Sequence, residues 1–550
     1  MSGIIRGMKS AAKSLPTIDK PIAKEVTELR GIIQRKDTEL KHKNHQIEQL
    51  LDYIQLLRQK QFGRSSEKSN KQQINLFDEA ELEALLAELE EQLDAEVSVE
   101  GPAPGKPPVQ KKKPVRRPLP ADLKRIEKII DLPAAEKQSM GEDWVLIGYE
   151  KSEQLAVIPR QHYVIVTRRA KYAPVNDEVS GAEQGIKVAP RPDQIIPKSI
   201  GHSSVIADVA AAKFVDGLPF YRQEKIYARD GIDLSRQTMS GWIIQLEARL
   251  LPLMQAMKQL LYEGKVLHID ETRLQVLNEP NRDNTQQSYM WVYRGGLPAK
   301  PVVWFQYADS RSGHVPVDFL YPQEDRDKDT ETERSFTIMT DGYRGYHALR
   351  KMPGVSGHAA CWAHARRKFV EASQGRKNTA AAYQMVAFIG KLYQIERSIK
   401  DKTPDERKVI RLEKAEPILT KIKGWLDGKA NKALPKSLLG KAIHYTLRLW
   451  PQLVVYLEDG HIPIDNNPAE NAIRPFVIGR KAWLFSGSPR GARASGMLYS
   501  LIESAKANDL EPKAYLNHLF EHLPAAKTKQ AVIKLLPQNL QKLDLAGLGE

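Results

Sequence analysis

Three acidic residues lie where a charged side chain needs a chemical reason. Asp270 is inside the apolar run KVLHIDETRLQVL, Asp341 ends the apolar part of SFTIMTDGYRGYHAL, and Glu470 follows a turn of asparagines and a proline. A carboxylate within an apolar strand is costly unless it is paired or binds a cation. Three such oxygens suit Mg²⁺, with Mn²⁺ as a substitute, and two ions about 4 Å apart can catalyse phosphodiester chemistry. The three acids are therefore candidate catalytic residues and metal ligands.

Each acid also has an ordinary structural explanation. Asp270 could lie on the solvent face of an edge strand, and Asp341 could be a plain turn residue. Asn467-Pro468-Ala469-Glu470 is typical of a helix start, in which Glu470 reaches back to the backbone N–H of Asn467 and closes a capping box. Asp465, five residues before Glu470, is an alternative third ligand. These interpretations stay open at this point.

Basic residues are numerous, and several follow the acids closely. The net charge of +15 and the pI of about 9.4 predict an acidic partner such as double-stranded DNA. The candidate contacts to the DNA backbone in this half of the chain are Arg366, Arg367, Lys368, Arg474, Arg480, Lys481, Arg490 and Arg493.

Cys361 and His364 form a Cys-x-x-His pair just before the first of these bases. Two ligands do not complete a zinc site, so we expect a structural role, or a phosphate contact for His364.

The three acids must be positioned by secondary-structure elements, and the apolar runs around them predict such elements. Residues 265–277, 287–296, 300–310 and 335–349 contain strand-like apolar runs with short breaks, and 354–373 holds a short strand and then a basic helix. Strands followed by helices predict a mixed sheet with helical cover. The fold class expected from this half is α+β.

Residues 203–250 have helical periodicity with a break at Gly231 and a candidate cap at Ser235. This pattern predicts either a helix-turn-helix or an ordinary helical hairpin. In the first case Arg236, Gln237 and Thr238 head the second helix and contact base edges.

The N-terminal part is patterned differently. From Val26 to Gln61, eight of eleven positions with heptad spacing are apolar, which predicts self-association through a coiled coil, or a long helix packed within the chain. Residues 76–94 predict an acidic amphipathic helix, and 101–120 a proline-rich linker whose bases suit phosphates. These bases include Lys111, Lys112, Lys113, Arg116 and Arg117. Short alternating runs in 126–200 predict a small β-rich module.

Some classes are excluded by composition. Cys361 is the single cysteine, so neither an internal disulfide nor a cysteine-based zinc finger can form. The sequence has no run of about 18 uncharged apolar residues that could cross a membrane, and the N-terminus lacks the apolar core of a signal peptide. We expect a cytoplasmic, nucleoid-associated protein.

The sequence motifs around the three acids resemble those of a known protein family. The order of strand Asp, strand-end Asp-Gly-Tyr and Asp-Asn-Asn-Pro-Ala-Glu-Asn resembles the DDE transposases on a ribonuclease H-like fold, and most closely those of the bacterial insertion-sequence-66 (IS66) family. The matching stretches are QFGRSSEK, IDETRLQVL, TDGYRGY, CWAHARRKF, IDNNPAENAIRPFVIGRKAWLFSGS and SLIESAKANDLEPKAYLNHL. The resemblance assigns the catalytic triad to Asp270, Asp341 and Glu470.

The resemblance implies a multidomain chain. We expect a coiled coil (1–70), an acidic helix and basic linker (71–125), a β-rich module (126–200), a helix-turn-helix-like module (201–255), a ribonuclease H-like catalytic domain (256–500) with a helical insertion (about 378–460), and a C-terminal helical extension (501–550). The family's middle module holds zinc through Cys-x-x-Cys pairs, which are absent here, so zinc is not expected.

The implied activity is that of a transposase. It binds the terminal inverted repeats of an element, hydrolyses a phosphodiester with Mg²⁺, and joins the freed 3′ hydroxyl to target DNA. Such elements usually encode small accessory proteins, which are candidate partners. The alternatives are a plain nuclease on the same fold and an inactive relic that regulates by binding DNA.

Overall fold

The computed structural model describes residues 161–172, 187–322, 335–373 and 381–545. The chain divides into two compact units, one of Val97–Pro192 and one of Met1–Glu96 with Asp193–Glu550. In the first unit the described elements are two antiparallel strands, β1 (Lys171–Tyr172) and β2 (Lys187–Val188). The predicted coiled coil, acidic helix, basic linker and most of the β-rich module lie outside the described residues.

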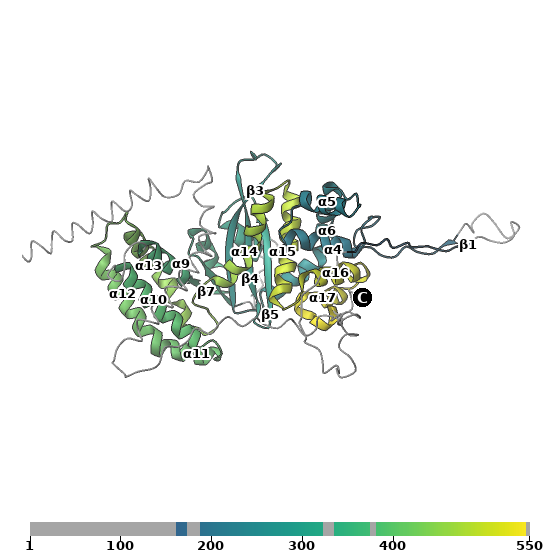
Figure 1. The fold of residues 1–550 in the computed structure, drawn as a ribbon. Helices are drawn as coiled ribbons and strands as arrows, with labels where there is room; N and C mark the ends of the chain where they lie inside the picture. Colours follow the sequence, from purple (N-terminus) through teal and green to yellow (C-terminus); the bar gives the residue numbers. More distant parts are fainter. Residues whose placement is uncertain (1–160, 173–186, 323–334, 374–380, 546–550) are drawn as a thin grey trace, which may run out of the picture. The chain divides into compact units, whose positions relative to one another are not determined.

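The second unit is built on one mixed sheet (Figure 1). Its strands are β3 (Val266–Val276), β4 (Gln287–Leu297), β5 (Lys300–Ala308), β6 (Phe336–Thr340) and β7 (Val355–Ala360), in the order β5-β4-β3-β6-β7. The first three pair antiparallel, while β6 and β7 run parallel to β3. The two-residue β8 (Phe485–Ser486) pairs with the end of β3. The mixed sheet predicted from the apolar runs is confirmed, and its arrangement is consistent with a ribonuclease H-like domain.

Helices cover this sheet. The helix α14 (Asn467–Trp483) packs against β3 and β4, and α15 (Pro489–Ala507) packs along β5. Two serines of α15 bond to the edge strand, because the backbone N–H groups of Val303 and Phe305 donate to Ser504 Oγ (2.9 Å) and Ser500 Oγ (2.7 Å). The helix therefore satisfies the free backbone groups of β5, which an exposed edge would leave open to other chains.

In the described part of the chain, three helices precede the sheet. They are α4 (Ser203–Phe214), α5 (Phe220–Arg229) and α6 (Arg236–Leu261). Gly231 has a φ of +75°, and the Ser235 hydroxyl caps α6 by accepting from the N–H of Thr238 (3.2 Å), as the sequence predicts. The later part of α6 packs on β4 and β5, so this helix also belongs to the core of the sheet.

A helical segment lies between β7 and α14. After α9 (Trp362–Ser373) come α10 (Ala381–Ser398), α11 (Pro404–Ile410), a π-helical turn (Arg411–Ala415), α12 (Glu416–Ala430) and α13 (Leu438–Leu453). The helices α10, α12 and α13 and the π-helical turn share an apolar core with α9 that is separate from the core under β3–β5, and α13 packs on β7 and α9.

Short helices complete the unit. They are α7 (His314–Leu320), a 3₁₀ helix (Arg344–Lys351), α16 (Pro512–His522) and α17 (Lys529–Lys534). The helix α16 packs against α4 and α15. None of the described helices has the length and apolarity to cross a membrane.

Candidate active site

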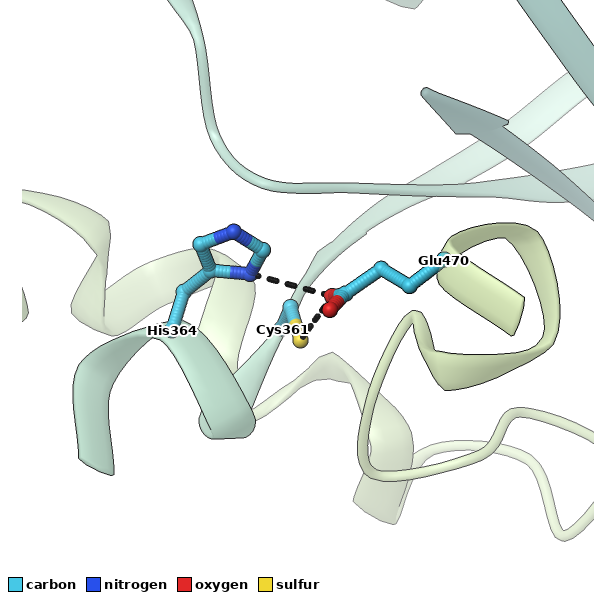
Figure 2. A group of neighbouring side chains, drawn as sticks. All are labelled: Cys361, His364 and Glu470. Carbon is cyan, nitrogen blue, oxygen red and sulfur yellow. Dashed lines mark hydrogen bonds and ion pairs between the residues drawn. The ribbon is translucent and has the colours of Figure 1, made fainter. Parts of the chain in front are cut away.

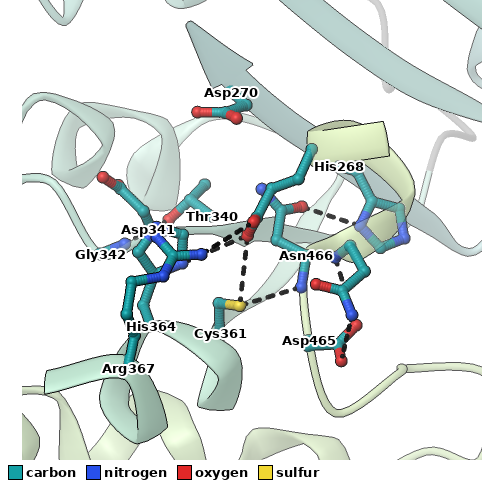
Figure 3. A network of polar contacts seen from close by, with 12 residues as sticks. His268, Asp270, Thr340, Asp341, Gly342, Cys361, His364, Arg367, Asp465 and Asn466 are labelled. Carbon is teal, nitrogen blue, oxygen red and sulfur yellow. Dashed lines mark hydrogen bonds and ion pairs between the residues drawn. The ribbon is translucent and has the colours of Figure 1, made fainter. Parts of the chain in front are cut away.

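The three candidate acids come from three different elements. Asp270 is the fifth residue of β3, Asp341 directly follows the last residue of β6, and Glu470 is in the first turn of α14. In the parallel β3–β6 pair His268 is the partner of Met339, which puts Asp270 level with Asp341, and α14 packs on β3, so all three belong to the region around the end of β6. Figure 3 shows Asp270 and Asp341 on the same side of the point where α14 begins.

The electrostatics of Asp270 reflect this convergence. Burial raises the pKa of Asp270 well above its ordinary value, and the neighbouring charges of Glu271, Glu470 and Asp341 raise it further. The N–H of Glu271 donates to Asp270 Oδ1 (2.9 Å), which acts in the opposite direction. Carboxylates that raise one another's pKa in this way are stabilised by a cation placed between them.

A second buried acid lies beside this group. Glu271 is almost fully buried and accepts hydrogen bonds from Arg311 and from the hydroxyl of Tyr346. Burial and the charge of Asp341 raise the pKa of Glu271 to about 7, although Arg311 opposes the shift. Arg311 also comes within 4.0 Å of Asp341 Oδ2 and stacks on the ring of Tyr343. One guanidinium thus bridges Glu271 and Asp341.

The carboxylate of Glu470 points into a polar cluster with Cys361 and His364 (Figure 2). Its Oε1 accepts from the thiol of Cys361 (3.7 Å) and lies 3.3 Å from His364 Nδ1, and its Oε2 accepts from Arg367 Nη2 (3.4 Å). Burial raises the pKa of Glu470, whereas burial and the charge of Arg367 lower the pKa of His364 to about 4. His364 is therefore neutral at pH 7, and Arg367 is the cation that faces Glu470.

The capping-box explanation of Glu470 is wrong. The helix α14 begins at Asn467 itself, and the N–H of Asn467 donates to Asp465 Oδ1 (3.2 Å), not to Glu470. Asp465 also accepts from the side chain of Asn467 (3.0 Å) and is directed away from Asp270 and Asp341 (Figure 3). Asp465 shapes the turn, and Glu470 is left to face the site.

Asn466 fastens the start of α14 to β3. Its side-chain amide donates to the carbonyl of Ile269 (3.1 Å), and its Oδ1 contacts His268 Nδ1 (2.9 Å). The N–H of Asn466 donates to Cys361 Sγ (3.2 Å), and its side chain is fully buried. These bonds hold the residues before Glu470 next to the residue that precedes Asp270.

The turn that carries Asp341 is held by the helical insertion. The hydroxyl of Tyr445 in α13 donates to the carbonyl of Asp341 (2.7 Å), and Asp341 Oδ1 accepts from the N–H of Tyr343 (2.7 Å). Gly342 has a φ of +80°, and a Cβ there would come within 2.5 Å of Leu449. Glycine is thus required both by the backbone conformation and by the close approach of α13.

The candidate DNA contacts differ in exposure. Arg236 and Gln237 are exposed at the start of α6, and Lys481, Arg490 and Arg493 are exposed around the end of α14 and the start of α15. Arg366 and Arg480 are instead buried, the first beside the ring of Tyr393 and the second 3.4 Å from Thr272 Oγ1. Thr238, Lys368 and Arg474 are partly buried, and Lys111, Lys112, Lys113, Arg116 and Arg117 lie outside the described residues.

Several residues of the site were not singled out in the sequence. Glu271, Arg311, Asn466 and Tyr445 each contact a candidate acid or its immediate neighbours. Glu271 and Asn466 are adjacent to recognised motif positions, which is a usable indication. Arg311 and Tyr445 lie in segments without a motif, and only the fold brings them to the site.

Comparison with known proteins gives three matches along the chain. The sequence model described as Transposase IS66 family matches residues 198–494, and the IS66 C-terminal element matches residues 500–538. The family's leucine-zipper model, described as Transposase C of IS166 homeodomain, matches residues 49–127.

Three relatives come from Sinorhizobium fredii, and all are named as uncharacterized proteins. The protein y4qI is 30% identical over 516 residues, which is 91% of this chain and 90% of y4qI. The proteins y4jD and y4hP are 31% and 28% identical and cover 72% and 74% of this chain, or 76% and 73% of their own lengths.

The Transposase IS66 family match spans more than half of the chain and includes all three candidate acids, with the leucine-zipper and C-terminal elements on either side in the expected order. The chain belongs to the IS66 family of DDE transposases.

Proposed function

We propose that this chain binds the ends of an insertion element, cleaves phosphodiesters with a divalent metal, and joins the resulting 3′ hydroxyl to target DNA. Asp270, Asp341 and Glu470 are the proposed catalytic acids. The observation that carries the proposal is the position of the three acids where β3, the end of β6 and the start of α14 adjoin, and the charges of Glu470 and Asp341 accordingly add to the burial that raises the pKa of Asp270.

The donor set suits the divalent metal that the family implies. Asp270, Asp341 and Glu470 offer hard carboxylate oxygens, and Mg²⁺ prefers a few carboxylates together with water and substrate phosphates. Bound there, the metal would activate the attacking oxygen and stabilise the leaving one. The repulsion among these acids, which raises the pKa of Asp270, is the cost that such a cation removes.

The surrounding residues have separate proposed roles. Asn466 and Tyr445 orient the start of α14 and the Asp341 turn through their bonds to Ile269 and Asp341. Arg311 neutralises Asp341 and Glu271 while no metal is present. Lys481 and Arg490 are exposed near the end of α14 and are proposed to contact DNA phosphates.

Recognition of the element ends is proposed for the start of α6. Arg236 and Gln237 are exposed there, and Ser235 caps the helix so that its first turn is well defined. Pairing of two ends is proposed for the leucine-zipper element, which associates two chains. Removing Arg236 would weaken binding of the terminal repeat without altering the carboxylates.

Substitution of Asp270 tests the catalytic assignment. Asp270→Asn keeps the size of the side chain but lacks the charge, so we expect cleavage of terminal-repeat DNA with Mg²⁺ to fall at least about 100-fold while binding of the same DNA is retained. Asp309→Asn, at an exposed acid after β5, is the matched control and keeps full activity.

The same assay separates the alternatives. Wild-type cleavage without joining of 3′ ends would indicate a nuclease, and binding without cleavage would indicate a regulatory relic. Normal cleavage by Asp270→Asn would remove Asp270 from the catalytic set.

A further inference from the structure

Cys361, His364 and Glu470 converge on one point from three elements. Cys361 follows β7, His364 is in the first turn of α9, and Glu470 is in the first turn of α14. One potential ligand atom from each lies within 4.8 Å of the other two (Figure 2). It is the one group of three His, Cys, Asp or Glu ligands with this geometry in the described part of the chain. The sequence offered two ligands of a metal site, and the fold supplies a third.

The distances resemble the edges of a tetrahedral metal site. Zn²⁺ is bound at about 2.3 Å by sulfur and about 2.0–2.1 Å by nitrogen or oxygen, which places two ligand atoms of a tetrahedron about 3.3–3.6 Å apart. Glu470 Oε1 lies 3.3 Å from His364 Nδ1 and 3.7 Å from Cys361 Sγ. An ion would therefore need only small shifts of these side chains.

Without a metal, the contacts within this group are weak. The bond from the Cys361 thiol to Glu470 is long at 3.7 Å, and the buried Nδ1 of His364 has no partner with hydrogen-bond geometry. A buried polar atom without a partner needs an explanation, and an ion is one of the few available. The other oxygen of Glu470 accepts from Arg367, so Oε1 is the oxygen directed at Cys361 and His364.

We propose that Cys361, His364 and Glu470 form an inhibitory site for a thiophilic divalent cation such as Zn²⁺. As the cation binds, the Cys361 thiol releases its proton to solvent, the sulfur becomes a ligand, and no electron is transferred. Thiolate and imidazole ligands select Zn²⁺ or Co²⁺ over Mg²⁺, which prefers oxygen. An occupied site holds Oε1 of Glu470 and withdraws this carboxylate from Asp270 and Asp341. The metal site stands on geometry alone, while the inhibition rests on the proposed function.

Cobalt titration of the metal-free full chain tests the site directly. Cys361 is the chain's single cysteine, so a thiolate-to-cobalt charge-transfer band in the near ultraviolet can come from no other residue. We expect this band to saturate at one Co²⁺ per chain, together with the intense visible bands of a tetrahedral site. Zn²⁺ should displace the band at equimolar concentration, and excess Mg²⁺ should not.

Variants assign the ligands. Cys361→Ser should abolish the charge-transfer band. His364→Gln and Glu470→Gln should retain a weak band and lower the affinity for Co²⁺ at least about 100-fold, because even partners outside the coordination sphere are worth about 10- to 100-fold. His444→Gln, at an exposed histidine of α13, is the matched control and should bind Co²⁺ as the wild type does. No band in the wild type, or unchanged affinity in both His364→Gln and Glu470→Gln, would overturn the site.

Cleavage assays then test the inhibition. Zn²⁺ at saturating concentration should suppress wild-type cleavage in Mg²⁺ at least about tenfold, given the several kcal/mol that a catalytic metal ligand contributes. The residual cleavage of His364→Gln should be insensitive to the same Zn²⁺. A saturable cobalt band with cleavage that ignores Zn²⁺ would overturn the inhibition. A cobalt band in a chain that cleaves under no condition would support the metal site and contradict the proposed function.

Discussion

Among the single residues of the site, Glu470 has a role that is defined by the groups its two carboxylate oxygens face. Oε1 is directed at Cys361 and His364, Oε2 accepts from Arg367, and the helix N–H groups that a cap would serve are bonded elsewhere. A true capping box exists in the same chain at Thr403 and Glu406, where both reciprocal bonds form. Glu406 is the third residue of its helix and Glu470 is the fourth residue of α14, and the two glutamates have different partners.

Glu470→Gln is expected to fold with a melting temperature close to that of the wild type. Glutamine removes the cost of burying a carboxylate, and this gain offsets the weaker bond to Arg367. Cleavage and strand transfer should fall at least about 100-fold, because an anionic metal ligand worth several kcal/mol is lost. Thermal unfolding and a terminal-repeat cleavage assay measure the two effects.

Glu406→Gln is the matched control for this experiment. Its glutamine can still accept from the N–H of Thr403, so stability and activity should both be retained. An active Glu470→Gln protein beside an inactive Asp465→Asn protein would instead assign the third carboxylate to Asp465.

Among the helices and strands, the positions of the strands were predictable from the sequence, but the hydrogen bonds that join distant elements at the site were not. Alternating apolar residues around Asp270 predict a strand over 265–277, and β3 spans Val266–Val276. The bond from Asn466 to Ile269 joins residues 197 positions apart, and that from Tyr445 to Asp341 joins residues 104 apart. Such pairs leave no periodic pattern in the sequence.

Arg411 illustrates the same limit. In the sequence it is one base in a charged helix, yet its side chain is almost fully buried in the π-helical turn. Its guanidinium donates to the carbonyls of Tyr456 (2.7 Å), Asp459 (3.2 Å) and Ile462 (2.9 Å), and pairs with Glu396. Arg411 thereby fixes the segment that leads to α14, a role that charge patterning cannot reveal.

His358 makes the folding stability pH-dependent at the strand ends near the site. Its Nδ1 accepts from Arg350 Nε (3.0 Å), so its proton is assigned to Nε2, which donates to Thr340 Oγ1 (2.8 Å). Burial and the charge of Arg350 lower the pKa of His358 from 6.5 to about 3. Because the unfolded chain takes up this proton first, stability is complete above about pH 6.5 and is lost progressively as the pH falls toward 3.

His358→Gln should remove this contribution, since a glutamine can accept from Arg350 and donate to Thr340 without titrating. Between pH 7 and pH 5 the wild type should lose about 2 kcal/mol more unfolding free energy than His358→Gln. Urea denaturation at the two pH values measures this difference. Equal losses in both proteins would mean that His358 is protonated in the folded state at pH 5.

At the scale of the whole molecule, the charges of opposite sign are separated by location. The acids of the site are gathered where β3, β6 and α14 meet, whereas exposed bases such as Lys481, Arg490 and Arg493 lie around the end of α14 and the start of α15. Along the chain, residues 78–100 hold ten acids and no base, and residues 101–125 hold eight bases and one acid. The net charge of +15 therefore understates how strongly basic some segments are, which suits a partner with a phosphate backbone.

The N-terminal heptads are expected to join two chains, which would bring two element ends together. The heptad positions run from Val26 to Gln61 and continue into the leucine-zipper match that begins at residue 49. Apolar side chains at such positions gain stability by packing into a partner helix, and a charge there leaves a buried ion without compensation. The double variant Leu50→Lys/Leu57→Lys should therefore halve the mass measured by light scattering.

The same variant should still bind one terminal repeat, because the start of α6 is unchanged, but it should bring two repeats together poorly. Gln49→Lys/Gln55→Lys is the matched control, since it adds the same two charges at positions outside the heptad core and should keep the wild-type mass. Equal masses for the wild type and the Leu50→Lys/Leu57→Lys protein would mean that the heptads pack within a single chain. Pairing of the ends would then have to come from the part of the chain that carries the sheet.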